Sequence, residues 1–188
     1  RARRAEGPAV VRALDLARGV DAPLGERREA VRARVRHGGP ALARVPERDR
    51  LAEELDAPVQ IHLHETRDEV LNSVERVGAR PVDFLEQRGL LGPRTQCVHM
   101  TALGEQDMDT LTTFGAHVVH CPRSNLKLGS GMCPVQRLLE REINVALGTD
   151  GAASNNRLNM LSELQLASLI GKTEQGDSKA VDAWTALE

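Results

Sequence analysis

The segment QIHLHET, residues 60–66, places two histidines at the end of a strand-like run and a glutamate directly after them. A neutral imidazole such as that of His62 can bind a metal ion, and Glu65, three residues on, could move protons beside that ion. On a strand, His62 and His64 would point to the same face. The segment is equally typical of solvated polar residues at a strand end. We interpret His64 as a structural residue or a pocket wall.

Three further polar side chains end apolar, strand-like runs: His99 in CVHM, His120 in VVHC and Asp150 in ALGTDGAASNN. An aspartate in this position can bind a metal ion and can also accept a proton from a bound water molecule. It can equally cap a turn, which is a frequent use of Asp in a sequence such as TDG. No single segment therefore identifies a site, and the order of the segments carries more information.

The segment HCPRSNLKLGSG, residues 120–131, is rich in Gly, Ser and Asn. It indicates a long polar loop that could wrap a polar ligand or simply connect two elements. The phosphate-binding pattern GxxxxGK[ST] does not occur, so the segment is not a P-loop. Cys121 has no second cysteine at a zinc-binding spacing and no identifiable electropositive partner, which argues against a zinc–cysteine site and a catalytic cysteine.

The elements that must position these residues alternate along the chain from about residue 47. Helical patterns cover 47–56, 66–78, 81–89, 104–115, 134–142 and about 157–172, and strand patterns cover 57–64, 95–100, 116–121 and 143–148. Four strands separated by helices predict an α/β fold with a parallel sheet. Polar groups at successive strand ends favour part of a (β/α)8 barrel over a doubly wound sheet, whose GxGxxG turn is absent. Residues 1–45 contain no convincing strand.

Composition describes a globular protein, because 40% of the 188 residues are hydrophobic and 28% are charged. No apolar run approaches the ~20 residues that a membrane-spanning helix needs, so we expect no membrane partner. The three cysteines have no CxxC spacing and no secretory signal precedes them, which predicts reduced thiols and a cytoplasmic location.

Charge is unevenly distributed, because residues 1–50 hold thirteen arginines and a net charge of +6, whereas residues 51–188 have a net charge of −8. A basic segment could bind nucleic acid. However, this one has no aromatic residue to stack on bases, and the acidic remainder would repel phosphate. We therefore expect an arginine-rich lead-in over residues 1–45 and no nucleic-acid partner.

Taken together, PVQIHLHET, CVHM, VVHCPRSNLKLGSGMCPV and VALGTDGAASNNRLNMLSELQLASLIGK resemble the amidohydrolase superfamily. More closely, they are similar to the 5-methylthioadenosine/S-adenosylhomocysteine deaminases. The resemblance runs from about Leu51 to Lys172, and SNLKLGSG together with GTDGAASNN is its most specific part. It implies the C-terminal portion, about four βα units, of an amidohydrolase-type (β/α)8 barrel in residues 46–188.

The resemblance also implies roles for individual residues. His62 and Asp150 match ligands of one divalent metal, which would be zinc, with iron and manganese as alternatives. Glu65 matches the general acid–base that protonates the purine ring, Asp150 also takes a proton from water, and His99 matches the histidine beside the attacking water. His120 and residues 124–131 would line the pocket, and no residue is assigned to substrate binding. The implied reaction is hydrolytic deamination of S-adenosylhomocysteine or 5-methylthioadenosine to the inosyl product and ammonia.

The sequence departs from the family upstream of residue 62, where the His-x-His pair that supplies two further ligands is missing. The one earlier histidine is His37, in a Gly-rich connection. We therefore expect an incomplete barrel that is inactive in isolation, preceded by a stretch of other origin such as a shifted reading frame. Alternatives are an amidohydrolase acting on a guanine- or chlorotriazine-type heterocycle and a non-catalytic half-barrel. Open sheet edges make a homo-oligomer a further expectation.

Overall fold

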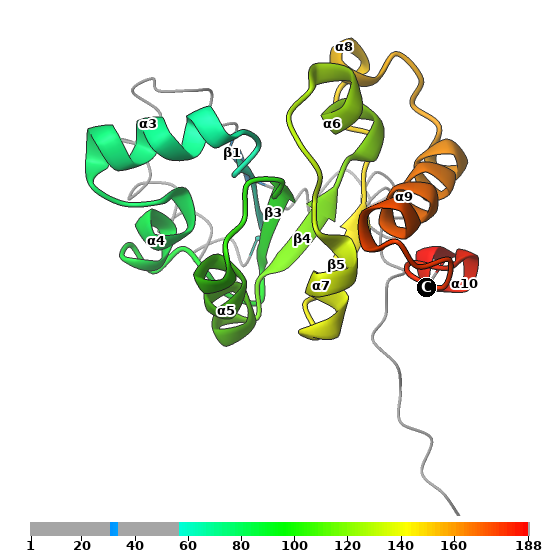
Figure 1. Cartoon of the computed structure of the whole chain (residues 1–188). Coiled ribbons are helices and arrows are strands. Elements are labelled where there is room, and N and C mark those ends of the chain that lie inside the picture. Colours follow the sequence, from blue (N-terminus) through cyan, green and yellow to red (C-terminus); the bar gives the residue numbers. More distant parts are fainter. Residues whose placement is uncertain (1–30, 34–56, 188) are drawn as a thin grey trace, which may run out of the picture.

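The computed structural model describes residues 31–33 and 57–187. Five parallel strands form one sheet in the order β1-β2-β3-β4-β5, so that each strand pairs with its neighbours in sequence (Figure 1). The strands are β1 (Val31–Ala33), β2 (Val59–Leu63), β3 (Thr95–His99), β4 (His117–His120) and β5 (Val145–Leu147). From β2 to β5, helices lie between successive strands, and this arrangement is that of consecutive βα units, as the sequence predicts.

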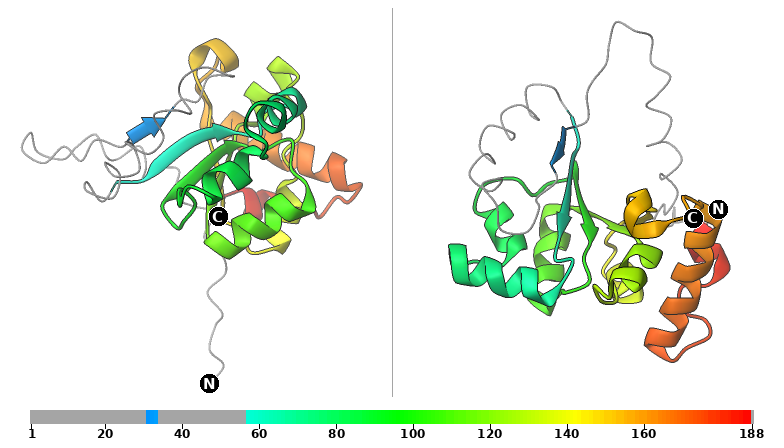
Figure 2. Two further views of the ribbon diagram at one scale, coloured as in Figure 1. Left: turned by 90° about the vertical axis from the view of Figure 1, so that its left-hand side faces the viewer. Right: turned by 90° about the horizontal axis from the view of Figure 1, so that it is seen from above.

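Helices follow strands β2 to β5, and several of them cover one face of the sheet. They are α3 (Arg67–Val77), α4 (Pro81–Glu86), α5 (Glu105–Phe114), α6 (Pro122–Leu128), α7 (Val135–Glu140), α8 (Ala152–Asn155), α9 (Met160–Gln175) and α10 (Ala183–Leu187). Helices α4, α5 and α7 lie along the same side of the strands in the views of Figures 1 and 2. Within the described part of the chain, no helix is long and apolar enough to cross a membrane.

The main core lies between this helical layer and the sheet. Its buried members include Ile61, Cys97 and Val118 from the strands and Leu111 and Leu138 from the helices. A second, smaller cluster contains the buried residues Val98, Val119 and Cys121. Because successive residues of a strand point to opposite faces, the neighbours Cys97 and Val98 mark the two faces of the sheet.

Local sequence signals explain where the helices begin and end. The Thr66 side chain accepts a hydrogen bond from the Glu69 N–H at the start of α3, and Gly78 ends this helix in the left-handed conformation with φ 73°. Asn159 caps α9 in the same way by accepting from the Ser162 N–H. Such caps satisfy backbone groups that the first and last helical turns leave unpaired.

Two sequence-based expectations about elements are wrong. Residues 1–45 do contain a strand, β1, which pairs in parallel with β2; at three residues it is too short for its periodicity to be recognised, and the pairing defines it. The loop expected at 120–131 is largely the helix α6, with Pro122 in its first turn and Gly129 as its left-handed end. Pro and Gly in these places favour a helix despite the polar composition.

The other expected elements agree with the observed ones to within a few residues, except that the helix expected over 47–56 lies outside the described residues. The same holds for His37 and for most of the arginine-rich lead-in. The division into residues 1–45 and 46–188 therefore stays a prediction. In the described part of the chain β1 and β5 are the edges of the sheet, which agrees with the open, partial barrel that the sequence predicts.

Candidate metal centre at the carboxyl ends of the strands

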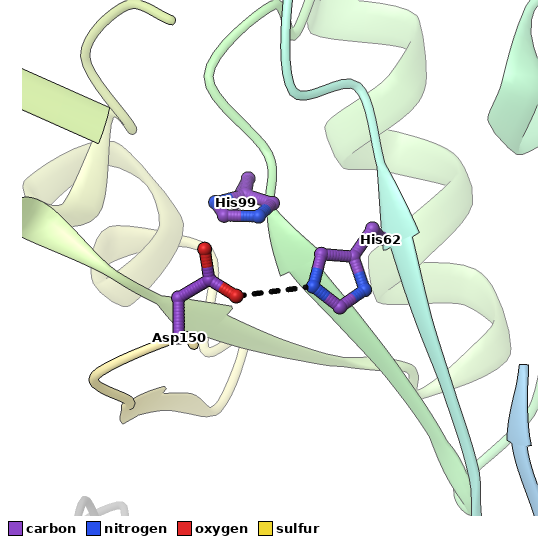
Figure 3. A group of neighbouring side chains, drawn as sticks. All are labelled: His62, His99 and Asp150. Carbon is purple, nitrogen blue, oxygen red and sulfur yellow. Dashed lines mark hydrogen bonds and ion pairs between the residues drawn. The ribbon is translucent and has the colours of Figure 1, made fainter. Parts of the chain in front are cut away.

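The candidate site lies where the parallel strands end on one edge of the sheet. His62 is on β2, His99 is the last residue of β3, and Asp150 follows β5. Figure 3 shows the three side chains converging from these separate elements. The strand order brings them together, because βα units place all carboxyl ends at the same edge.

These three residues form a group that could hold a metal ion. One ligand atom from each of them lies within 4.8 Å of those of the other two. The Nε2 atom of His62 is 3.4 Å from the Oδ1 atom of Asp150, and the rings of His62 and His99 have centroids 5.0 Å apart. Two imidazole nitrogens and a carboxylate oxygen are donors that zinc-class divalent ions accept. Sequence analysis had assigned His99 a catalytic role; the geometry adds the capacity to bind the metal.

The backbone turns His99 towards His62. In register, His62 pairs with Val98 and Leu63 pairs with His99, so a regular strand would direct residue 99 towards the main core, as it does Leu63. Instead His99 has φ 78°, and its ring lies beside that of His62. Positive φ values are uncommon in residues other than glycine and concentrate at functional sites.

A buried amide selects the tautomer of His99. The Nδ1 atom lies 2.8 Å from the Oδ1 atom of Asn125. Because an amide oxygen only accepts, Nδ1 carries the proton, and neutral His99 keeps a lone pair on Nε2. The Nε2 atom makes no hydrogen bond within the described residues, and it lies 3.9 Å from the Oε2 atom of Glu65. The lone pair is therefore available towards the site.

Asp150 is held by two serine hydroxyls. Ser124 of α6 and Ser154 of α8 both donate to its Oδ2 atom, so its Oδ1 atom is the one that faces His62. Burial alone would raise the pKa of Asp150, but the hydrogen bonds from Ser154 and Ser124 outweigh it and lower the pKa to about 2. The carboxylate is thus ionised at neutral pH, as a metal ligand must be.

Glu65 lies just beyond the end of β2 and is fixed from both sides. The Ser130 hydroxyl donates to its Oε1 atom at 3.2 Å, and the Thr101 hydroxyl donates to its backbone oxygen at 2.7 Å. Its backbone N–H donates to Glu69. The carboxyl group is therefore next to the metal-binding group but not part of it, as an acid–base residue requires.

His64 does not share the direction of His62, contrary to the expectation that both point to one face. Strand β2 ends at Leu63, and His64 has φ 50°. Its Nε2 atom accepts from the Val82 N–H and its Nδ1 atom contacts the Ala102 oxygen. Burial lowers the pKa of His64, so the ring is a neutral structural link between α4 and the loop after β3, consistent with its predicted structural role.

His120 ends β4 but is not brought into the metal-binding group of the described residues. Its ring is buried, and neither nitrogen has a hydrogen-bond partner in the described part of the chain. Burial and the nearby His99 lower its pKa to about 3. The neutral ring can therefore serve as packing beneath the site, and its predicted place in the pocket wall stays a prediction.

Sequence reasoning missed the individual roles of Ser124, Ser130 and Ser154. The first two lie in the segment that was assigned to the pocket wall without a specific role, and Ser154 lies in the turn after Asp150. The signal was a concentration of Ser and Asn near the expected site. Which serine hydroxyl binds which carboxylate depends on how α6 and α8 pack. The periodicity of the sequence does not predict this packing.

Comparison with known proteins identifies the family. The family model described as "Amidohydrolase family" matches residues 28–188. The chain belongs to the amidohydrolase family. This confirms the predicted superfamily and the predicted partial-barrel fold class.

Relatives of this amidohydrolase bear the deaminase name that the sequence motifs resemble. A 5-methylthioadenosine/S-adenosylhomocysteine deaminase of Saccharophagus degradans is 56% identical over 138 residues, which are 73% of this chain and 31% of that protein. The deaminase of the same name from Pyrococcus abyssi is 47% identical over 128 residues, 68% of this chain and 30% of that protein. The chain thus spans about a third of the length of these curated relatives.

Solved structures show the same relationship. An adenosine deaminase from Xanthomonas campestris with bound zinc superposes with a TM-score of 0.74 at 45% identity, covering 77% of this chain and 33% of that one. A guanine deaminase from C. acetobutylicum with bound guanine has a TM-score of 0.66 at 27% identity, covering 73% of this chain and 34% of that one. The described residues of this amidohydrolase therefore have the architecture of one part of such enzymes.

Proposed function

We propose that this amidohydrolase chain supplies the metal-binding and proton-transfer residues of a nucleoside deaminase. The substrate is an adenosine-type nucleoside, S-adenosylhomocysteine or 5-methylthioadenosine, and the products are the inosyl nucleoside and ammonia. The observation that carries the proposal is the convergence of His62, His99 and Asp150 within 4.8 Å, with the Glu65 carboxylate 3.9 Å from His99. Two of these residues, His62 and Asp150, are assigned as metal ligands.

Zinc is the proposed metal, with iron and manganese as alternatives. The imidazole and carboxylate donors suit all three ions, and the ionised Asp150 and the free lone pair of His99 fit a cation at this place. When bound, such an ion lowers the pKa of a water molecule from 15.7 to about 7. It thereby makes a nucleophile available at neutral pH.

The protein residues move the protons that the reaction requires. Water adds to C6 of the adenine ring, a C–O bond forms, and the C6–N bond breaks to release ammonia. Asp150 accepts a proton from the water. Glu65 in its acid form protonates the ring nitrogen next to C6, which prepares that carbon for attack, and it regains a proton from the hydroxyl group added at C6 as the carbonyl forms. Asp150 passes the proton that it took from the water to the leaving nitrogen. The hydrogen bond from Ser130 to Glu65 orients the carboxyl group for both tasks.

Sequence identity favours an adenosine-type substrate over the other heterocycles. The relative named as a 5-methylthioadenosine/S-adenosylhomocysteine deaminase is 56% identical to the chain and the adenosine deaminase structure is 45% identical. By contrast, the guanine deaminase and an atrazine chlorohydrolase from Arthrobacter aurescens are each 27% identical. A guanine- or chlorotriazine-type substrate is thus the second candidate.

Two further expectations belong to this proposal. We place the enzyme in the cytoplasm, which is supported by three free cysteines, because structural disulfides mark oxidising compartments. We also expect a homo-oligomer in the complete enzyme.

A chimera tests the proposed function in a complete barrel. The 138 residues of the Saccharophagus degradans deaminase that align with this chain are replaced by the chain's own residues. We expect the chimera to deaminate S-adenosylhomocysteine or 5-methylthioadenosine, followed as loss of adenine absorbance.

Two variants of the chimera assign the roles. Glu65→Gln is expected to lower turnover by about 10²–10⁴-fold with metal content unchanged, because Gln cannot carry a proton. Asp150→Asn should impair turnover more severely than folding, because the substitution keeps the side-chain volume but removes the negative charge and the proton acceptor. Thermal unfolding of the variant measures the effect on folding. Near-normal turnover by the Glu65→Gln chimera would show that Glu65 is not the acid–base residue. A correctly folded, metal-loaded chimera without turnover would count against the proposed substrate class.

A further inference from the structure

The buried carboxylate of Glu163, on α9, links the two segments that hold Asp150. We propose that Glu163 is a positioning residue: it holds Ser124 and Ser154 in place around the Oδ2 atom of Asp150, so that the Oδ1 atom stays directed at the metal site. The inference rests on the proposed role of Asp150 as a metal ligand.

Each oxygen of Glu163 binds the neighbour of one serine. The Oε2 atom accepts from the backbone N–H of Arg123 at 3.1 Å, and Arg123 directly precedes Ser124. The Oε1 atom accepts from the Nδ2 atom of Asn155 at 2.9 Å, and Asn155 directly follows Ser154. A single carboxylate thus joins α6 and α8, although Arg123 and Asn155 are 32 positions apart in the sequence.

The serines complete the link to Asp150. Both hydroxyls donate to the Oδ2 atom, while the Oδ1 atom lies 3.4 Å from Nε2 of His62. Two donors on one oxygen fix the rotation of the carboxylate, and this decides which oxygen the metal meets. The backbone is held as well, because Nδ2 of Asn155 also donates to the oxygen of Thr149, the residue before Asp150, at 2.7 Å.

The burial of Glu163 supports a specific role over general packing. Its side chain is fully buried, and the Arg123 guanidinium lies 3.4 Å from Oε1. Burying a charge is costly even when it is paired, and apolar residues of similar volume often stabilise such a position as well or better. A carboxylate here is explained by its need to accept two hydrogen bonds from the segments on either side.

Zinc affinity of the 188-residue chain tests the proposal without relying on deaminase activity. Glu163→Gln keeps the volume, but its amide places a donor against either the Arg123 N–H or the Asn155 amide. We expect zinc affinity, measured by competition with a chromophoric chelator, to fall by about 10–100-fold. The matched control is Asp107→Asn. Asp107 is equally buried, accepts from the Gly104 N–H and pairs with Arg80, but it contacts neither serine.

The control variant is expected to lose stability and to keep zinc affinity within about twofold of the unmodified chain. Equal losses of affinity in Glu163→Gln and Asp107→Asn would overturn the proposal, because the effect would then follow from destabilisation alone. His62→Ala distinguishes an error in the proposed metal site from an error in the proposed role of Glu163. If it leaves zinc affinity unchanged, the metal site itself is wrong; if it lowers affinity while Glu163→Gln does not, only the positioning role is wrong.

A double-mutant cycle asks whether Glu163 acts through the serines. In a chain that already carries Ser124→Ala and Ser154→Ala, adding Glu163→Gln should change zinc affinity by less than about twofold. A full, additive loss in that background would show that Glu163 acts by another route. If Glu163→Gln does not fold, Asn155→Ala replaces it: it removes the contact at Oε1, together with the bonds of Asn155 to Thr149 and Arg157, and leaves the contact at Oε2 in place. This variant should bind zinc more weakly than the unmodified chain, and no loss of affinity would overturn the proposal.

Discussion

The Nε2 atom of His62 lies 3.4 Å from the Oδ1 atom of Asp150, although the two residues are 88 positions apart in the sequence. The contact joins the end of β2 to the loop after β5 across the intervening strands β3 and β4. It forms because all strands are parallel and end at the same edge. Hydrogen bonds from Ser124 and Ser154 reach the other oxygen of Asp150, so the contact also identifies Oδ1 as the oxygen that faces the proposed metal site.

The isolated 188-residue chain is expected to have no deaminase activity. The family resemblance implies two further ligands from a His-x-His pair, and the sequence has no such pair before His62. Fewer ligands leave a bound ion with low affinity and poorly defined geometry. Purified chain supplied with zinc, iron or manganese should leave the adenine absorbance of S-adenosylhomocysteine unchanged. Metal-dependent turnover above that of a Glu65→Gln chain would refute this prediction.

Gly131 is expected to be required for the placement of Glu65. It has φ 132°, and a Cβ atom there would lie 2.8 Å from the Thr101 hydroxyl, which itself binds Glu65 and Ser130. Gly131→Ala in the chimera should therefore lower turnover at least tenfold. Gly129→Ala is the control: it also strains a left-handed backbone (φ 65°), by about 1–2 kcal/mol, but a Cβ atom there meets nothing within 4 Å.

Equal turnover in the two alanine variants would mean that the contact between Gly131 and Thr101 does not position Glu65. Thermal unfolding of both variants distinguishes a displaced catalytic loop from a general loss of stability.

Acid should destabilise the metal-free chain through His120. Burial lowers its pKa to about 3 in the folded state, whereas an unfolded histidine has a pKa of about 6.5. Between these values the unfolded state binds more protons than the folded state, so stability falls as the pH drops below about 6.5. The slope is roughly 1 kcal/mol per pH unit for one such group.

Urea unfolding at several pH values between 7 and 4 measures this slope. His120→Leu, which removes two buried nitrogens without hydrogen-bond partners among the described residues, should flatten it and leave stability at pH 7 equal or higher. His117→Leu is the control, because His117 lies at the opposite end of β4 and its ring contacts the Pro93 oxygen near the surface. An unchanged slope in His120→Leu would contradict the assignment.

Much of the fold could be predicted from the sequence, because helix and strand periods alternate clearly from residue 57 onwards. Apolar runs that end in His99, His120 and Asp150 also indicated that polar groups meet at one sheet edge. Strand β1 could not be recognised, since three residues carry no period and only pairing with β2 defines them. Helix α6 was interpreted as a loop because its Ser and Asn residues are typical of turns; in the structure Ser124 and Asn125 are buried and hydrogen-bonded to the site.

Side-chain directions at the strand ends could not be predicted from strand alternation. His64 and His99 both have positive φ values, and these turn each ring away from the face that a regular strand would give it. Such conformations depend on tertiary contacts, here the bond from Val82 to His64 and that between His99 and Asn125. The sequence therefore indicated which residue types gather at the site, while the contacts that orient them depend on the packed structure.

The metal affinity of His62→Ala tests the central claim most directly. Zinc binding to the 188-residue chain is titrated against a chromophoric chelator, with His117→Ala as the matched histidine control at the other end of the strands. Removing a nitrogen ligand from a site of few ligands should lower affinity at least tenfold, and the control should stay within about twofold of the unmodified chain. Equal zinc affinity in the unmodified chain and His62→Ala would contradict the proposed metal centre.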